Sequence, residues 1–186
     1  PIIKATSLAL NTKVNAVNID AHTDLRNPDE GRHSGNGFST AIKDGYLDEY
    51  RIFGLQQNYV NKRIAAQIAT SQNIKVIYFE ELLQSGESIA ANWKSFTKPL
   101  NQPCGLEIDL DSVENVLSSA ISPSGFALNE IRKMLLGNQK QYSYLHICEG
   151  ATMLADGRDD LTTGKTIAYL VTDFIKAHQL HICPQP

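Results

Sequence analysis

The stretch that decides the fold reads Val14-Asn15-Ala16-Val17-Asn18-Ile19-Asp20-Ala21-His22-Thr23-Asp24. Its first six residues form a largely apolar run that is typical of a buried strand. Alternate residues of an extended chain point to the same side, so we expect Asp20, His22 and Asp24 to direct two carboxylates and one imidazole toward a common point beyond the strand. Oxygen and nitrogen ligands in this mixture suit Mn²⁺, Zn²⁺ or Fe²⁺ better than Ca²⁺ or Mg²⁺.

A second acidic cluster repeats this pattern in the β-prone run Leu106-Glu107-Ile108-Asp109-Leu110-Asp111. Its three acidic residues share one face of the expected strand, and its apolar residues share the other. Each cluster alone is also compatible with a solvated strand end whose carboxylates cap the next turn. Together they predict five or six ligands around one crevice, which is enough for two metal ions that share bridging carboxylates.

The order of elements predicts an α/β fold, a three-layer α/β/α arrangement with a mostly parallel sheet. Strands are expected at 14–19, 51–55, 75–79, 104–110 and 144–148, and helices at 2–10, 38–43, 61–70, 89–96, 128–136 and 163–176. In such sheets the ligand site lies outside the carboxyl ends of the strands, which is where both acidic clusters are expected.

Length and composition narrow the class of protein. The chain has 186 residues, which favours a single domain over residues 1–186, and its net charge of -3 without a Lys/Arg-rich run argues against nucleic acid as a partner. No apolar stretch approaches the roughly 18–20 residues that span a bilayer, so no membrane association is expected. The three cysteines lack metal-type spacing, and Cys104 and Cys148 are expected to be buried thiols, which fits a reducing cytoplasm.

Four stretches of the chain resemble the ureohydrolase superfamily, which contains arginase, agmatinase and formimidoylglutamase. They are residues 20–26, 33–38, 107–111 and 122–126, which read DAHTDLR, HSGNGF, EIDLD and SPSGF. The Asp-Leu-Arg and Ser-Gly-Asn-x-Phe details are most similar to the formimidoylglutamase branch. The resemblance implies an arginase/deacetylase-like fold, two Mn²⁺ ions and hydrolysis of the C–N bond of a small formimino or guanidino compound by a metal-bridged hydroxide, with a formimidoylglutamate-like substrate favoured.

The expected metal ligands are Asp20, His22, Asp24, Asp109 and Asp111. Asp24, bridging the metals, is also the candidate that passes a proton to the leaving amine. Glu149 follows the strand at 144–148, and the resemblance implies that a glutamate here contacts the cationic group of the substrate. The alternative for Glu149 is an ion pair with Arg158 or Lys165.

Three residues of the long loop after the first cluster are further candidates. Arg26 can grip a substrate carboxylate with two hydrogen bonds, or it is an ordinary solvated arginine. Asn36 can bond the polar end of the substrate, or it is a turn residue. His33 is a candidate proton shuttle because imidazole titrates near neutrality.

Arginases have a histidine where this chain has Phe38, which disfavours arginase. His146 is expected to be a satisfied core residue.

One departure from the family bears on activity. The resemblance implies a glycine-rich strand end with another histidine ligand upstream of the first cluster, and the printed chain, which starts at Pro1, lacks that motif. We therefore expect an N-terminally truncated member with an open sheet edge, which favours homo-oligomers. The alternative function is a non-catalytic fragment that serves as a folded or oligomerising module. Another two-metal hydrolase is a third reading, although a phosphatase would show further His and Asn ligands.

Overall fold

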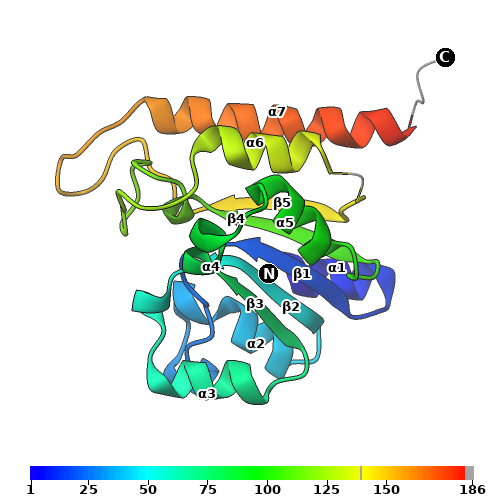
Figure 1. Ribbon diagram of the computed structural model, residues 1–186. Helices are drawn as coiled ribbons and strands as arrows, with labels where there is room; N and C mark the ends of the chain where they lie inside the picture. The colour runs from blue at the N-terminus through cyan, green and yellow to red at the C-terminus, as the bar shows by residue number, and fades with distance from the viewer. Residues whose placement is uncertain (139, 183–186) are drawn as a thin grey trace. The chain divides into compact units, whose positions relative to one another are not determined.

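A five-stranded sheet in the order β3-β2-β1-β4-β5 organises the computed structural model, which describes residues 1–138 and 140–182 (Figure 1). The strands are β1 Val14–Ile19, β2 Leu47–Leu55, β3 Ile74–Tyr78, β4 Cys104–Asp109 and β5 Tyr144–Cys148. The α-helices are α1 Ile2–Leu10, α2 Gly37–Lys43, α3 Lys62–Thr70, α4 Phe79–Gln84, α5 Ile89–Thr97, α6 Leu128–Leu136 and α7 Thr162–Ile182. Short 3-10 helices are η1 Pro28–Glu30, η2 Ser34–Asn36, η3 Gln57–Tyr59 and η4 Leu110–Ser112.

The sheet is parallel where its register is described. β1 pairs in parallel with β2, and β2 pairs in parallel with β3. Every residue of β1 and of β4 is buried, as expected for strands that are covered on both faces. The predicted α/β fold with a parallel sheet is therefore confirmed.

The chain divides into two compact units. Unit 1 comprises Pro1–Gln84, Leu100–Glu107 and Tyr142–His146, and unit 2 comprises Ser85–Pro99, Ile108–Gln141 and Ile147–Pro186. Strands β1, β2 and β3 lie in unit 1 together with the first part of β4 and of β5. The chain passes from unit 1 into unit 2 within β4 and again within β5.

The core of unit 1 forms around β1 and β2. Buried residues from these strands pack with α1, α2 and α3, and the cluster includes Val14, Ala16, Tyr50, Ile52 and Ile64. Phe38 from α2 stacks on Tyr50 from β2, with ring centroids 4.1 Å apart and planes 16° apart. Offset aromatic pairs of this kind add to the stabilisation that comes from burial alone. The stack fixes α2 against the strand that neighbours β1.

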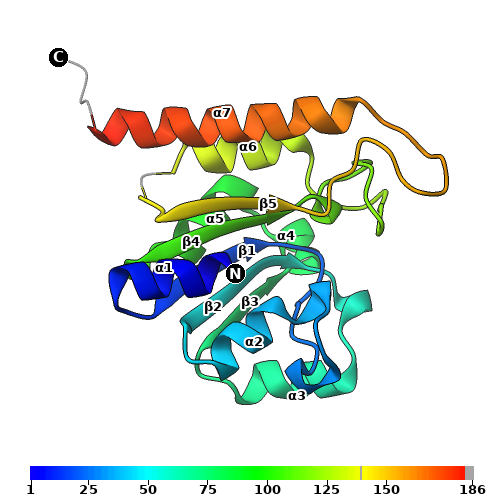
Figure 2. The same cartoon turned by 180° about the vertical axis from the view of Figure 1, so that it is seen from behind.

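Unit 2 contains a pair of packed helices, and α6 lies along α7 in both views (Figure 1 and Figure 2). Ile131 and Met134 of α6 and Leu170 of α7 are buried. Arg132 Nε donates to Asp173 Oδ2 at 2.6 Å, and Asp173 is only 1% exposed. The buried carboxylate of α7 is thus paired with a guanidinium from α6, which is the condition for burying a charge at acceptable cost.

Several elements differ from those predicted: α4 was not predicted, α7 extends to Ile182 and not to residue 176, and β2, β3 and β4 have different bounds. β2 begins at Leu47 and not at residue 51. Its first residues are mixed in polarity and partly exposed, so a search for apolar runs does not detect them. Phe79 begins the helix α4 and does not end the strand before it. Glu80 and Glu81 lie in the first turn of α4, where acidic residues interact favourably with the helix dipole, and Glu81 also accepts a hydrogen bond from the Tyr78 amide.

Two of the three cysteines lie within the described residues. Cys104 is buried and Cys148 is half-buried, and both are free thiols, whereas Cys183 lies outside the described residues. Among the described helices, none combines the length and apolar character that crossing a membrane requires.

Substituting Gly105 with Ala should destabilise the fold. A Cβ at Gly105 would lie 2.0 Å from Cζ of Tyr144, so the tyrosine ring would have to move. Overpacking of this kind lowers the free energy of unfolding by about 1–3 kcal/mol. Gly86→Ala is the matched control, because a Cβ there meets nothing within 4 Å, and the change should stay within about 0.5 kcal/mol. Urea unfolding of both variants tests this, and equal stabilities would contradict the packing at Gly105.

Candidate metal centre

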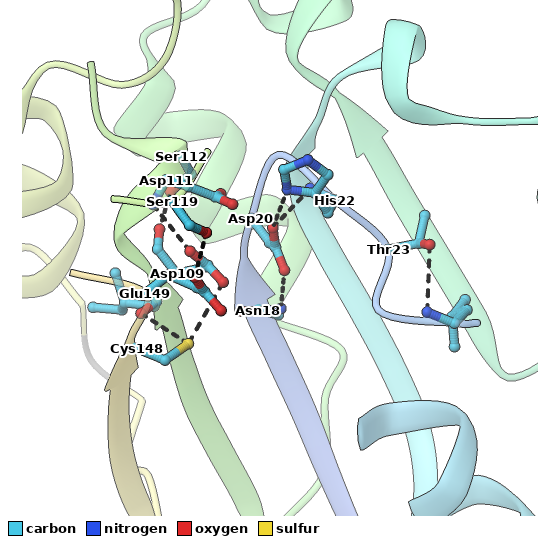
Figure 3. Close-up of polar contacts among 12 residues, drawn as sticks. Asn18, Asp20, His22, Thr23, Asp109, Asp111, Ser112, Ser119, Cys148 and Glu149 are labelled. Atoms are coloured by element: carbon cyan, nitrogen blue, oxygen red, sulfur yellow. Dashed lines mark hydrogen bonds and ion pairs between the residues drawn. The ribbon is translucent and has the colours of Figure 1, made fainter. Parts of the chain in front are cut away.

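Asp20 and His22 lie together where β1 ends. The Asp20 carboxylate is completely buried, and its two oxygens accept hydrogen bonds from the His22 amide and from Asn18 Nδ2, both at 2.7 Å (Figure 3). His22 Nδ1 lies 3.7 Å from Asp20 Oδ1, and the His22 side chain is about one-third exposed. The imidazole also rests against Tyr59, with ring centroids 4.4 Å apart. A buried carboxylate therefore lies beside a partly exposed imidazole.

The turn from Asp20 to Asp24 is not an extended strand, which corrects the predicted alternation. Asp20 accepts a hydrogen bond from the amide two residues ahead, a local turn that competes with strand geometry. Asp24 adopts a left-handed conformation with φ of 51°. Aspartate tolerates this conformation better than most residues because its short side chain can bond locally. The directions of the Asp20, His22 and Asp24 side chains are consequently set by this turn.

A series of buried hydrogen bonds connects Asn18 and Tyr50 to the turn between Asp20 and Asp24. Asn18 Nδ2 contacts both Asp20 Oδ2 and the Tyr50 hydroxyl, the latter at 3.2 Å. The Tyr50 hydroxyl donates to the carbonyl oxygen of Thr23 at 3.2 Å. Burial, and next the nearby Asp20 and Asp24 carboxylates, raise the pKa of Tyr50 well above its usual range. Tyr50 is thus kept protonated and able to donate.

Asp109 and Asp111, two of the three acidic residues of the second predicted cluster, lie in unit 2. Each is 4% exposed, and Asp109 Oδ1 accepts a hydrogen bond from the Asp111 amide at 2.9 Å. Cys148, at the end of β5, directs its thiol toward Asp109 Oδ2 at 3.6 Å (Figure 3). Asp111 lies in η4 and not in the strand, so the predicted alternation ends at Asp109. Asp109 caps this 3-10 turn just as Asp20 caps the turn after β1.

Glu107, the third acidic residue of the predicted cluster, has a different environment. It is 3% exposed and accepts hydrogen bonds from the Tyr144 hydroxyl at 2.6 Å and from His146 Nδ1 at 2.5 Å. Burial, and next the charge of Glu107, raise the pKa of Tyr144. The expectation that His146 is a core residue is wrong, because 47% of its side chain is exposed on β5. It is satisfied by the bond to Glu107, which lies on the neighbouring strand.

The loop after Asp24 holds Arg26, His33 and Asn36. Asn36 is 4% exposed, its Oδ1 accepts from the His33 amide at 3.2 Å and its Nδ2 donates to the Gly31 carbonyl at 2.6 Å. Asn36 therefore has the turn role that the sequence left open. Because the Gly35 amide donates to His33 Nδ1, a neutral ring carries its proton on Nε2. Arg26 Nη1 lies 3.4 Å from that Nε2, so two donors face each other and the contact is no hydrogen bond.

Glu149 directly follows β5, in a left-handed conformation with φ of 60°. Its Oε2 accepts a hydrogen bond from the Ser119 hydroxyl at 3.1 Å. Arg158, one of the two alternative partners, instead donates to Asp156 at 2.9 Å. Ser119 had no sequence signal as a partner of Glu149, because the two residues are 30 positions apart.

The donor sets of the two units fit a divalent cation. Buried carboxylates are costly unless positive charge or a metal balances them, and Asp20, Asp109 and Asp111 are all buried. The hydrogen bonds described above come from amide and thiol donors, which orient these carboxylates. Carboxylate oxygens with one imidazole match Mn²⁺, Zn²⁺ or Fe²⁺. Sequence reasoning missed Asn18, although a polar residue inside an apolar strand was a visible signal.

Comparisons with known proteins agree with the fold. The model of the arginase family matches residues 1–172, and no curated protein matches the chain in sequence. Formimidoylglutamase from Bacillus subtilis superposes with a TM-score of 0.81 at 18% identity, covering 96% of this chain and 57% of that chain. Formiminoglutamase from Trypanosoma cruzi, solved with Mn²⁺, gives 0.79 at 18% identity over 96% and 61%.

An arginase is also among the similar structures. The enzyme from Medicago truncatula gives a TM-score of 0.70 at 19% identity, covering 94% of this chain and 54% of that chain. The present chain thus spans less than two thirds of the length of each of these solved proteins. At such identities the likeness shows the fold alone.

Stability should fall in alkaline solution because of Tyr50. The native pKa of Tyr50 is raised, whereas a tyrosine in the unfolded chain ionises near pH 10. Above that pH the unfolded chain binds fewer protons, so each such tyrosine removes about 1.4 kcal/mol of stability per pH unit. Urea unfolding between pH 9 and 11 should show this decline, and Tyr50→Phe should make it shallower. Identical slopes in the two proteins would contradict a protonated, buried Tyr50.

Proposed function

We propose, since this chain belongs to the arginase family, that it is a metal-dependent hydrolase of the C–N bond of a linear amidine, with a formimino-glutamate-like substrate favoured over arginine. The observation that carries this proposal is the pair of buried carboxylate clusters, one after β1 and one at the end of β4, on strands that are neighbours in the sheet order. Parallel α/β sheets hold their ligands outside the carboxyl ends of such strands.

We assign the metal ligands to five residues, namely Asp20, His22, Asp24, Asp109 and Asp111. Two Mn²⁺ ions are the proposed cofactor, because the ligand types suit Mn²⁺ and the similar Trypanosoma cruzi formiminoglutamase was solved with that ion. When bound, such ions act as Lewis acids that lower the pKa of water and polarise the amidine carbon. The buried setting of Asp20 and Asp109 excludes bulk water and strengthens these electrostatic effects.

Two residues are proposed to move protons. Asp24 is half-buried at the end of the first turn, where its carboxylate can take a proton from the attacking water and pass it to the leaving amine. His33 is exposed in the loop after the turn and, with its Nδ1 occupied by the Gly35 amide, presents Nε2 for proton exchange with solvent. The two groups would connect the reaction to bulk water.

Two further residues are proposed to bind the substrate. Glu149, held by Ser119, would pair with the cationic formimino group. Arg26 is exposed, and its guanidinium would take the carboxylate tail of a glutamate-like substrate with two hydrogen bonds. Asn36, the third predicted contact, would act by shaping the loop that carries Arg26, because its amide already bonds within that loop. Phe38 supports a non-arginase substrate, since its stacked ring stands where arginases have a histidine.

Mn²⁺ should raise the melting temperature of the chain. A ligand at about 100 times its Kd stabilises by about 2.7 kcal/mol, which corresponds to roughly 5–10 °C for a protein of this size. His22→Ala and Asp109→Asn should each abolish the shift because they remove a ligand from the first and the second cluster. Asp48→Asn, which alters an exposed carboxylate paired weakly with Lys13, should leave the shift intact. An undiminished shift in both ligand variants would show that the metal binds elsewhere.

Arg26→Ala should raise KM for formimino-glutamate by about 10- to 100-fold with little change in kcat, because a charged hydrogen bond contributes about 1.5–3 kcal/mol to ground state and transition state alike. Formamide release measures this, and Arg32→Ala, in the same loop and also exposed, is the control. Urea release from arginine without turnover of formimino-glutamate would reverse the substrate assignment. Mn²⁺ binding without turnover of either compound would support the alternative of a non-catalytic, oligomerising module.

A further inference from the structure

Asn18 is an unusual residue for its position. It lies in β1, is 2% exposed, and its neighbours in the strand are Val17 and Ile19, both completely buried. A leucine or valine would fill such a site without any polar group to satisfy. The amide therefore needs a reason to be there, because a buried polar side chain costs stability unless its hydrogen bonds are made.

Among the described residues, the Asn18 side chain donates hydrogen bonds but accepts none. The Asp20 carboxylate, when ionised, can only accept, so the NH₂ group of Asn18 must face it at 2.7 Å. The Tyr50 hydroxyl donates to the Thr23 carbonyl and therefore accepts the other hydrogen of Asn18 Nδ2. The carbonyl oxygen of Asn18, Oδ1, is buried without a hydrogen-bond partner among the described residues. The amide oxygen thus lacks a hydrogen bond, while the NH₂ group bonds to both Asp20 and Tyr50.

Tyr50 links this amide to the far end of the turn. It is completely buried in β2, and Phe38 stacks on its ring, so the hydroxyl has little freedom to move. The hydroxyl bonds to the carbonyl oxygen of Thr23, and the next residue is Asp24, which has the left-handed conformation. Asn18 and Tyr50 together therefore bond to both ends of the turn that carries Asp20, His22 and Asp24.

We propose that Asn18 and Tyr50 are positioning residues that orient Asp20 and Asp24 for metal binding. This inference rests on the proposed function, since it assumes that both aspartates are ligands. Groups that hydrogen-bond to metal ligands fix their orientation, and losing such a group typically lowers metal affinity by about 10- to 100-fold. The arrangement trades fold stability for ligand geometry, because the unsatisfied Oδ1 of Asn18 benefits only the site.

The experiment compares variants by Mn²⁺ affinity, by the visible absorption spectrum of the Co²⁺-loaded chain and by the melting temperature without metal. Asn18→Leu removes the amide but keeps the number and branching of the side-chain heavy atoms, and Tyr50→Phe removes only the hydroxyl. We expect both to weaken Mn²⁺ binding about 10-fold and to change the Co²⁺ spectrum, which reports ligand geometry. The Co²⁺ spectrum separates this effect from a loss of stability, because a variant that is only less stable keeps the unaltered ligand geometry in its folded fraction.

Tyr144→Phe is the matched control, because Tyr144 is a partly buried tyrosine that donates to a buried carboxylate, that of Glu107, which is not among the assigned ligands. Its Mn²⁺ affinity and Co²⁺ spectrum should match those of the unaltered chain. If His22→Ala abolishes Mn²⁺ binding while Asn18→Leu and Tyr50→Phe bind like Tyr144→Phe, this inference is overturned and the proposed function stands. If His22→Ala binds Mn²⁺ unchanged, the proposed function itself fails. Should Tyr50→Phe not fold, the Asn18→Leu comparison decides alone.

Discussion

Buried negative charge is the constraint on which the rest of the structure depends. Asp20 after β1 and Asp109 at the end of β4 are almost completely inaccessible to solvent, and such carboxylates are stable only where the surroundings supply hydrogen bonds and positive charge. Each uses one oxygen to cap the backbone of the turn that follows it. The same side chain thereby ends a strand, and its other oxygen contacts a second group, Asn18 Nδ2 for Asp20 and the Cys148 thiol for Asp109.

The polar chain from Asn18 to Tyr50 shows how a site can be supported from the neighbouring strand. Hydrogen bonds in a buried, low-dielectric setting strengthen one another and tolerate little displacement. Tyr50 is itself fixed by the Phe38 stack, which ties the first turn to α2 and to the loop that carries Arg26. The hydrogen bonds that hold this turn are therefore joined to the packing of the core of unit 1.

Glu107 illustrates the opposite use of a similar side chain. It belongs to the same acidic run as Asp109 and Asp111, yet its carboxylate accepts hydrogen bonds from Tyr144 and His146 on β5. The difference arises from position along the strand, because Glu107 lies within the sheet where a neighbouring strand supplies donors. Asp109 is the last residue of the strand, and Asp111 lies in the 3-10 helix that follows it. Acidic residues of one run thus have different surroundings, which depend on their place relative to the strand end.

The sequence by itself determined the strands, most of the helices and the placing of both acidic clusters at strand ends. Apolar runs and turn residues are local signals, and β1, α1, α6 and β5 have the bounds that those signals predict. Only the tertiary structure decided the bent turn at Asp24 and the partners of Asn18, Glu149 and His146. Those partners, Tyr50, Ser119 and Glu107, lie 30 to 39 residues away along the chain. Periodicity within one element carries no information about side chains that folding brings in from another.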